Sequence, residues 1–172
     1  MDYVDGGDLD EAIEKKKKAM TKAKGVDKYW SEERVLHMFT QVCLGLKHLH
    51  DRKILHRDIK AQNVFMTKAG ILKLGDLGMC TLLSNTVARA KTFVGTPYYI
   101  APEIIKGKRY SFEADIWSMG ILLYEMCALC YPFDSESGSS KELYKNICAG
   151  YYDELPGHLQ DNLPLLVKMM MH

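Results

Sequence analysis

Hydrophobic residues recur at helical spacing along much of the chain, and this pattern predicts a mostly helical protein. The clearest case follows Ser31, which is expected to cap a long helix that carries Glu32 and Glu33 in its first turn. The apolar face of this helix consists of Val35, Met38, Phe39, Val42, Leu46 and Leu49. Another helix is predicted from Ser111 to about Leu129. It is apolar almost all round, which is typical of a helix in the middle of a domain.

Capping patterns predict further helices. Asp8 and Glu11 have capping-box spacing, so a short helix should begin there and run into the four lysines at 15–18. Ser139 and Glu142 have the same spacing and predict one more helix. Hydrophobic residues at 163–171 suggest a last helix near the end of the chain.

The middle of the chain has a different pattern. Two strand candidates, residues 63–66 and 71–74, are separated by the turn T-K-A-G, as in a hairpin. From residue 75 to 102 the periodicity is weak and polar residues are frequent. A connection of this length is usually functional or mobile.

Composition and charge change this picture little. The 172 residues, 47% of them hydrophobic and 26% charged, suit one domain with a sizeable core. The formal net charge of +1 argues neither for nor against a polyanionic partner. The longest apolar run, residues 116–133, is interrupted by Glu125 and flanked by aspartates, so it predicts a buried helix rather than a membrane span. Residues 1–9 are acidic, unlike a secretory signal peptide.

The five cysteines form no small-domain disulfide framework, and we interpret them as reduced thiols of an intracellular protein. Cys127 and Cys130 form a C-x-x-C in an apolar helical stretch, without a second ligand pair nearby. We expect a buried structural pair, and a zinc or redox site is the less favoured alternative.

Three motifs carry the candidate chemistry: H-R-D-I-K-A-Q-N at 56–63, D-L-G at 76–78 and A-P-E at 101–103. Phosphoryl transfer needs a proton acceptor for the attacking hydroxyl, oxygen ligands for Mg²⁺ and positive charge beside the transferred group. Asp58 fits the first role, Asn63 and Asp76 fit the second, and Lys60 fits the third. A helix cap at Asp58 and a turn residue at Asp76 would each be ordinary alone, but they do not explain the ordered set.

These motifs resemble the large C-terminal lobe of a eukaryotic protein kinase, and in detail the NIMA-related (NEK) serine/threonine kinases. The matching text includes K-L-G-D-L-G at 73–78, F-V-G-T-P-Y-Y-I-A-P-E at 93–103 and D-I-W-S-M-G at 115–120, while residues 1–9 resemble that family's hinge. The resemblance implies a mainly α fold with short β-hairpins. It also implies that residues 1–172 are a partial kinase domain, which has the hinge and the C-lobe but lacks the N-terminal β lobe and the final helices.

The resemblance assigns nucleotide and substrate contacts. Val4 would offer backbone hydrogen bonds to adenine, Phe65 would form the floor beneath it, and Asp2 belongs to the same cofactor-binding set. Thr96 would touch Asp58 and help place the substrate hydroxyl.

The resemblance also assigns supporting residues. His56 and Leu77 would belong to a packed regulatory column, and Leu77 replaces the phenylalanine of the usual D-F-G while keeping an apolar anchor. Asp115 would brace the catalytic loop, as expected of a carboxylate in an apolar helix. Glu103 would pair with an arginine beyond residue 172.

One regulatory site is implied. Thr92 lies in the weakly periodic stretch where this family is typically phosphorylated, and Arg57 would meet the phosphate and order the loop. The alternative is that Thr92 is a solvated loop residue.

The implied reaction of the full-length enzyme is transfer of the ATP γ-phosphoryl group to Ser or Thr of proteins, with ATP and Mg²⁺ as cofactors. No glycine-rich loop and no strand lysine precede the catalytic motifs, and Met1 falls at the gatekeeper position. We therefore expect a truncated sequence that is inactive by itself. The alternative is a non-catalytic half-kinase that acts as a scaffold or decoy, but retention of the candidate catalytic residues argues against it.

Expected partners are protein substrates rather than nucleic acid or a membrane. The expected location is the cytoplasm. Family likeness alone adds cytoskeletal or cell-cycle partners and association with the cytoskeleton.

Overall fold

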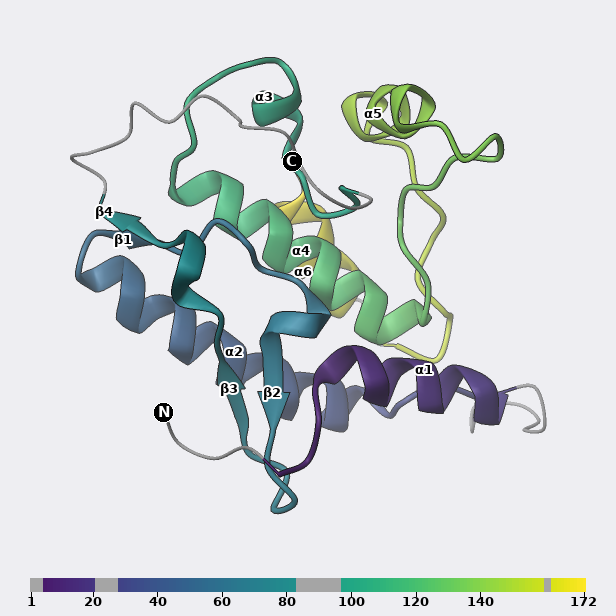
Figure 1. Ribbon diagram of the computed structural model, residues 1–172. Helices are drawn as coiled ribbons and strands as arrows, with labels where there is room; N and C mark the ends of the chain where they lie inside the picture. Colours follow the sequence, from purple (N-terminus) through teal and green to yellow (C-terminus); the bar gives the residue numbers. More distant parts are fainter. Residues whose placement is uncertain (1–4, 21–27, 83–96, 160–161) are drawn as a thin grey trace.

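The computed structural model describes residues 5–20, 28–82, 97–159 and 162–172, and they form a mainly helical fold with two small β-ladders (Figure 1). This confirms the predicted fold class. The helices are α1 (Leu9–Met20), α2 (Glu32–Asp51), α3 (Pro102–Ile105), α4 (Phe112–Ala128), α5 (Ser140–Ala149) and α6 (Asn162–Met170). The strands are β1 (Ile54–Leu55), β2 (Val64–Met66), β3 (Leu72–Leu74) and β4 (Thr81–Leu82), and the 3₁₀ turns are η2 (Ala61–Asn63) and η3 (Leu77–Met79).

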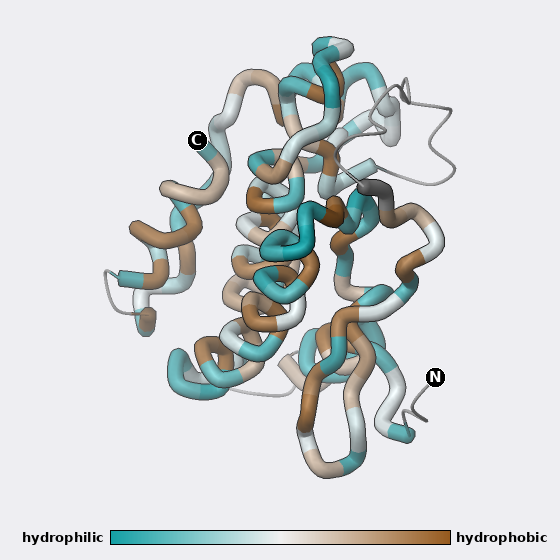
Figure 2. Tube along the Cα trace, turned by 90° about the vertical axis from the view of Figure 1, so that its left-hand side faces the viewer, coloured by the Kyte–Doolittle hydropathy of each residue, from teal (hydrophilic) through white to brown (hydrophobic). Residues whose placement is uncertain are grey.

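Helix α4 forms the centre of the fold, with α2 and α6 packed against it. Its residues are buried on nearly every side, as the all-round apolar pattern predicts. Gly120 allows α6 to approach closely, because a Cβ there would lie 2.7 Å from the Met171 Cγ atom. Helix α2 buries all of its predicted apolar face except Leu49, which is half-buried. In Figure 2 hydrophobic and hydrophilic residues alternate along the turns of the helices.

Strands β2 and β3 form the predicted antiparallel hairpin, in which Val64 pairs with Leu74 and Met66 pairs with Leu72. The chain before α1 is fastened to this hairpin, because the Gly6 amide donates to the Met66 carbonyl at 2.9 Å and the Met66 amide donates to the Gly7 carbonyl at 2.8 Å. Strand β1 pairs with β4. These contacts bring α1, the hairpin and residues 56–63 together on one side of α4 (Figure 1).

Two predicted caps are confirmed and one is wrong. The Glu11 amide donates to Asp8 Oδ1 at 2.9 Å, and the Arg34 amide donates to Ser31 Oγ at 3.4 Å. Helix α5 exists, but the Ser139 side chain makes no capping hydrogen bond. The Glu142 carboxylate instead accepts hydrogen bonds from the Ser135 and Ser137 hydroxyls, because the loop before α5 folds back over the first turn of the helix.

The expectation of a buried Cys127–Cys130 pair is wrong for Cys130. Cys127 is buried, but Leu129 adopts a left-handed φ of 57° and ends α4, so Cys130 lies beyond the helix and is exposed. Both thiols are free. Within the described ranges, no group of three or more His, Cys, Asp or Glu side chains is arranged to hold a metal ion. In the same ranges no helix is both long enough and apolar enough to cross a membrane.

Candidate active site

The loop between β1 and β2 brings three of the predicted catalytic residues together. Lys60 Nζ lies 2.7 Å from Asp58 Oδ2. The Asn63 amide nitrogen donates to the same Oδ2 atom at 2.8 Å and to the Asp58 carbonyl at 2.6 Å. Asn63 is buried, whereas about a third of the Asp58 side chain is exposed (32%). The loop therefore presents one carboxylate to solvent in a fixed orientation.

Asp115 of α4 holds this loop in place. It is fully buried, and it accepts hydrogen bonds from the His56 amide at 2.9 Å, the Arg57 amide at 2.9 Å, His50 Nε2 at 2.8 Å and the Tyr110 hydroxyl at 2.8 Å. Arg57 has a left-handed φ of 71°, which is strained for a residue with a side chain. The paired amides stabilise this backbone conformation, which turns the chain towards Asp58.

His56 links the loop to the segment before Asp76. Its Nε2 atom lies 3.1 Å from the Gly75 carbonyl, and since a carbonyl only accepts, Nε2 carries the proton. The opposite Nδ1 atom accepts a hydrogen bond from the Asp58 amide at 3.3 Å. Burial lowers the pKa of His56, which favours the neutral form that this pattern requires.

Asp76 follows directly after a glycine that contacts Asn63. The Gly75 amide donates to the Asn63 carbonyl at 2.9 Å, and a Cβ on Gly75 would lie 2.7 Å from the Phe65 ring. Asp76 itself is exposed, has a left-handed φ of 54° and accepts a hydrogen bond from the Gly78 amide at 3.4 Å. Among the described residues, no cation pairs with its carboxylate. The segment before Asp76 is therefore tied to Asn63 by one backbone hydrogen bond.

Three residues to which the sequence analysis gave no role also support the loop: Tyr99, Glu125 and Ser118. The Tyr99 hydroxyl accepts a hydrogen bond from the Ala61 amide at 3.2 Å and donates to the Glu125 carboxylate. The Ser118 hydroxyl donates a hydrogen bond to the Tyr99 carbonyl at 2.9 Å. Burial raises the pKa of Glu125 to about 7. The sequence signal for Glu125 is its position as the one acidic residue within the apolar run 116–133.

Helix α1 contacts the same loop through a polar pair. The Gln62 side-chain amide donates to Asp10 Oδ1 at 2.6 Å. Burial raises the pKa of Asp10, and the nearby carboxylates of Asp8, Glu14 and Glu11 raise it further. This contact ties the first helix to the segment that carries Asp58.

The other predicted site residues lie in several places. Phe65 is half-buried on β2 beside Gly75, and Leu77 is exposed at the start of η3. Glu103, on α3, lines a separate hollow of about 360 Å³ that also includes Trp117 and His172. The positions of Asp2, Val4, Thr92 and Thr96 lie outside the described residues.

Arg57 belongs to the 56–63 loop, and its side chain lies over an aromatic ring. Its guanidinium carbon lies 5.6 Å from the centre of the Tyr110 ring. Its Nε atom is buried and has no hydrogen-bond partner among the described residues. The expected contact of Arg57 with a phosphorylated Thr92 stays a prediction.

Comparison of the sequence with known proteins shows the family of the chain. A model of the protein kinase domain matches residues 1–170. The chain is 46% identical to the serine/threonine-protein kinase Nek3 of Mus musculus over 171 residues, 99% of the chain and 31% of that protein. It is 44% identical to Nek1 of Mus musculus over 170 residues, 99% of the chain and 13% of that protein. It is 41% identical to human Nek2 over 177 residues, 100% of the chain and 38% of that protein.

The chain therefore spans well under half of the length of these relatives, and it matches them across nearly its whole extent. The region matched by the family model, residues 1–170, contains the loop that joins Asp58, Lys60 and Asn63, and it contains Asp115, which braces that loop. The chain belongs to the protein kinase family, and the predicted resemblance to the NIMA-related serine/threonine kinases is confirmed.

Proposed function

We propose that this chain supplies the catalytic loop for transfer of the γ-phosphoryl group of ATP to serine or threonine residues of proteins. The observation that carries the proposal is the double hydrogen bond from Asn63 to Asp58, with Lys60 paired to the same carboxylate. Kinase catalysis depends mostly on positioning and electrostatic stabilisation. A carboxylate held by two donors and left partly exposed meets the positioning requirement.

Asp58 acts as the proton acceptor in this proposal. Lys60 and Asn63 both bind its Oδ2 atom, and no hydrogen bond from a residue that the structure describes reaches Oδ1, which is left for the hydroxyl of the acceptor residue. Lys60 then places positive charge beside the transferred group while its stem stays half-buried in the loop. Asp115, on α4, keeps the catalytic loop rigid through its hydrogen bonds to the His56 and Arg57 amides.

Asn63 and Asp76 are the residues that would hold Mg²⁺. They provide an amide oxygen and a carboxylate, the hard oxygen ligands that Mg²⁺ prefers. The Asn63 nitrogen is occupied by Asp58, and among the described residues no donor reaches its Oδ1 atom, so that oxygen is left for a ligand. Mg²⁺ bound together with ATP would neutralise part of the negative charge of the phosphates. The donor set therefore fits the ion.

The substrates, partners and location belong to the same proposal. The named relatives are serine/threonine kinases, which supports protein substrates. We also propose the cytoplasm as the site of action. The 172 residues contain no G-x-G-x-x-G loop, so we propose that the chain alone does not transfer phosphate.

A radiolabelled phosphotransfer assay on a generic protein substrate tests the proposal. The chain alone and the chain joined to a kinase N-terminal lobe are compared at equal concentration with Mg-ATP. We expect incorporation above the no-enzyme blank only with the joined form, on Ser and Thr. Absence of incorporation from the folded joined form would contradict the proposal, and incorporation by the chain alone would contradict its dependence on the second lobe.

A further inference from the structure

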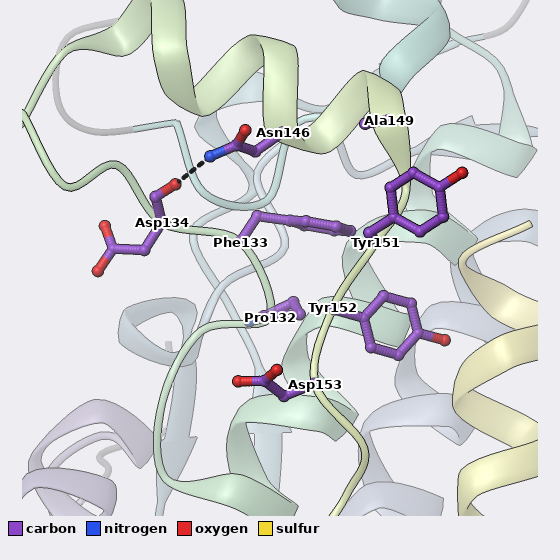
Figure 3. A pocket seen from close by; sticks show the side chains of 8 residues that line it. All are labelled: Pro132, Phe133, Asp134, Asn146, Ala149, Tyr151, Tyr152 and Asp153. Atoms are coloured by element: carbon purple, nitrogen blue, oxygen red, sulfur yellow. Dashed lines mark hydrogen bonds between the residues drawn. The ribbon is translucent and has the colours of Figure 1, made fainter.

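A hollow lies between the loop after α4 and the segment after α5 (Figure 3). It shares no lining residue with the candidate active site. Its volume is about 240 Å³, and its lining residues are Pro132, Phe133, Asp134, Asn146, Ala149, Tyr151, Tyr152 and Asp153. Sites for small organic ligands typically measure about 300–1,000 Å³. This hollow is therefore better matched to a single side chain than to a nucleotide.

The charge of the hollow is negative. Asp134 and Asp153 are both exposed, and no lysine or arginine lines the hollow. Asp134 Oδ1 accepts hydrogen bonds from the Ser135 amide at 2.7 Å and the Tyr98 hydroxyl at 3.4 Å. In the part of the chain that the structure describes, neither carboxylate has an ion-pair partner. An occupant that complements this lining is a cation.

Aromatic rings provide the rest of the surface. The Tyr151 side chain is 88% exposed, an unusually open position for so large a ring. In Figure 3 the two carboxylates lie on one side of the Phe133 ring, and Tyr151 and Tyr152 lie on the other. Ring faces attract cations, and the planar guanidinium of arginine also stacks on them.

Contacts with the core fix the walls of the hollow. The Phe133 ring stacks against Trp117 of α4, with ring centres 6.0 Å apart and an angle of 9° between the planes. The Asn146 side chain donates to the Asp134 carbonyl at 2.8 Å, and the Tyr124 hydroxyl donates to the Asp153 carbonyl at 3.2 Å. A preformed site loses less entropy on binding than one that must be ordered.

We propose that this hollow binds an arginine side chain presented by a protein partner. The guanidinium lies in the hollow, with the carboxylates of Asp134 and Asp153 on one side of it and the Tyr151 ring on the other. A lysine keeps the charge but lacks the planar fork that permits bidentate pairing and stacking. This docking site is separate from phosphoryl transfer and does not depend on it.

The test is an NMR titration of the 172-residue chain, labelled with ¹³C in its tyrosine rings. The probe is acetyl-Gly-Arg-Gly-amide, and the matched probes carry lysine or the neutral isostere citrulline. We expect saturable shifts of Tyr151 and Tyr152, binding of the lysine peptide weaker by about threefold or more, and no saturation with citrulline. Equal binding of the arginine and citrulline peptides would overturn the proposal.

Variants locate the site. Asp153→Asn keeps the backbone carbonyl that Tyr124 holds, and Tyr151→Ala alters an exposed ring, so both should fold. Each should weaken arginine binding by about fivefold or more. Asp51→Asn removes the same charge from the exposed end of α2 and should leave binding unchanged. Equal weakening by Asp51→Asn would show a general charge effect and refute a specific site.

Discussion

Asp115→Asn should destabilise the protein far more than its single-atom change suggests. Each carboxylate oxygen accepts two hydrogen bonds: Oδ1 from the Arg57 amide and the Tyr110 hydroxyl, and Oδ2 from the His56 amide and His50. An asparagine must direct its NH₂ group at one of these pairs. The Tyr110 hydroxyl can rotate and His50 can change its tautomer, but a backbone amide cannot become an acceptor.

The expected loss follows from this geometry. One buried amide is left without an acceptor, which costs about 1–3 kcal/mol, and the remaining bonds lose their charge-assisted strength. We therefore expect the free energy of unfolding to fall by roughly 3 kcal/mol, a large share of the roughly 5–15 kcal/mol typical of a domain. Tyr110→Phe removes only one donor and should cost about 1 kcal/mol.

Equilibrium urea unfolding, followed by circular dichroism at fixed pH, measures both changes. Glu14→Gln is the control, because it removes a carboxylate that is half-exposed and pairs with Lys17 on the surface of α1. Its effect should stay below about 0.5 kcal/mol. A loss for Asp115→Asn no larger than that of the control would refute the bracing role.

Three further predictions concern the pH dependence, the packing and the regulation of the protein. Burial raises the pKa of Glu125 from 4.5 to about 7, so the folded protein should lose stability as the pH rises between these values. In urea unfolding, Glu125→Gln should therefore gain stability relative to the wild type from pH 5 to pH 8. If the stabilities of both proteins change in parallel with pH, the assignment is contradicted. Gly75→Ala should lower the free energy of unfolding by about 1–3 kcal/mol, because its Cβ would overlap the Phe65 ring. Gly157→Ala is the control, because nothing lies within 4 Å of its Cβ position, and it should leave the stability unchanged. Equal melting temperatures of the two variants would contradict this packing. In the form joined to an N-terminal lobe, Thr92→Ala should abolish loop phosphorylation and lower turnover, as phosphopeptide mapping with a kinetic assay would show; full activity with no phosphate at this position would remove the idea.

Local patterns predicted the large elements correctly. The apolar face of α2 and the all-round apolar α4 follow from residue spacing alone, and the 67–70 turn marks the hairpin between β2 and β3. These features depend on neighbours in sequence, which is why sequence reasoning recovers them.

Features set by distant contacts were harder to predict. Strands β1 and β4 are two residues each and exist because the chain returns to pair Ile54 with Leu82. The bond between Tyr99 and Glu125 joins segments with no shared local pattern. At Glu142 the local rule favoured a capping box, but the serines of the preceding loop provided competing donors.

The central claim is that Asp58 accepts the proton while Asn63 and Asp76 hold the metal. It is tested most directly by Asp58→Asn and Asp76→Asn in the form joined to an N-terminal lobe. Turnover on a protein substrate and calorimetric Mg-ATP affinity are measured side by side.

We expect Asp58→Asn to abolish turnover while Mg-ATP affinity stays near wild type, because the change removes a proton acceptor and no phosphate contact. Asp76→Asn should lose affinity as well as turnover, because it removes a metal ligand. Wild-type turnover from the Asp58→Asn enzyme would contradict the account.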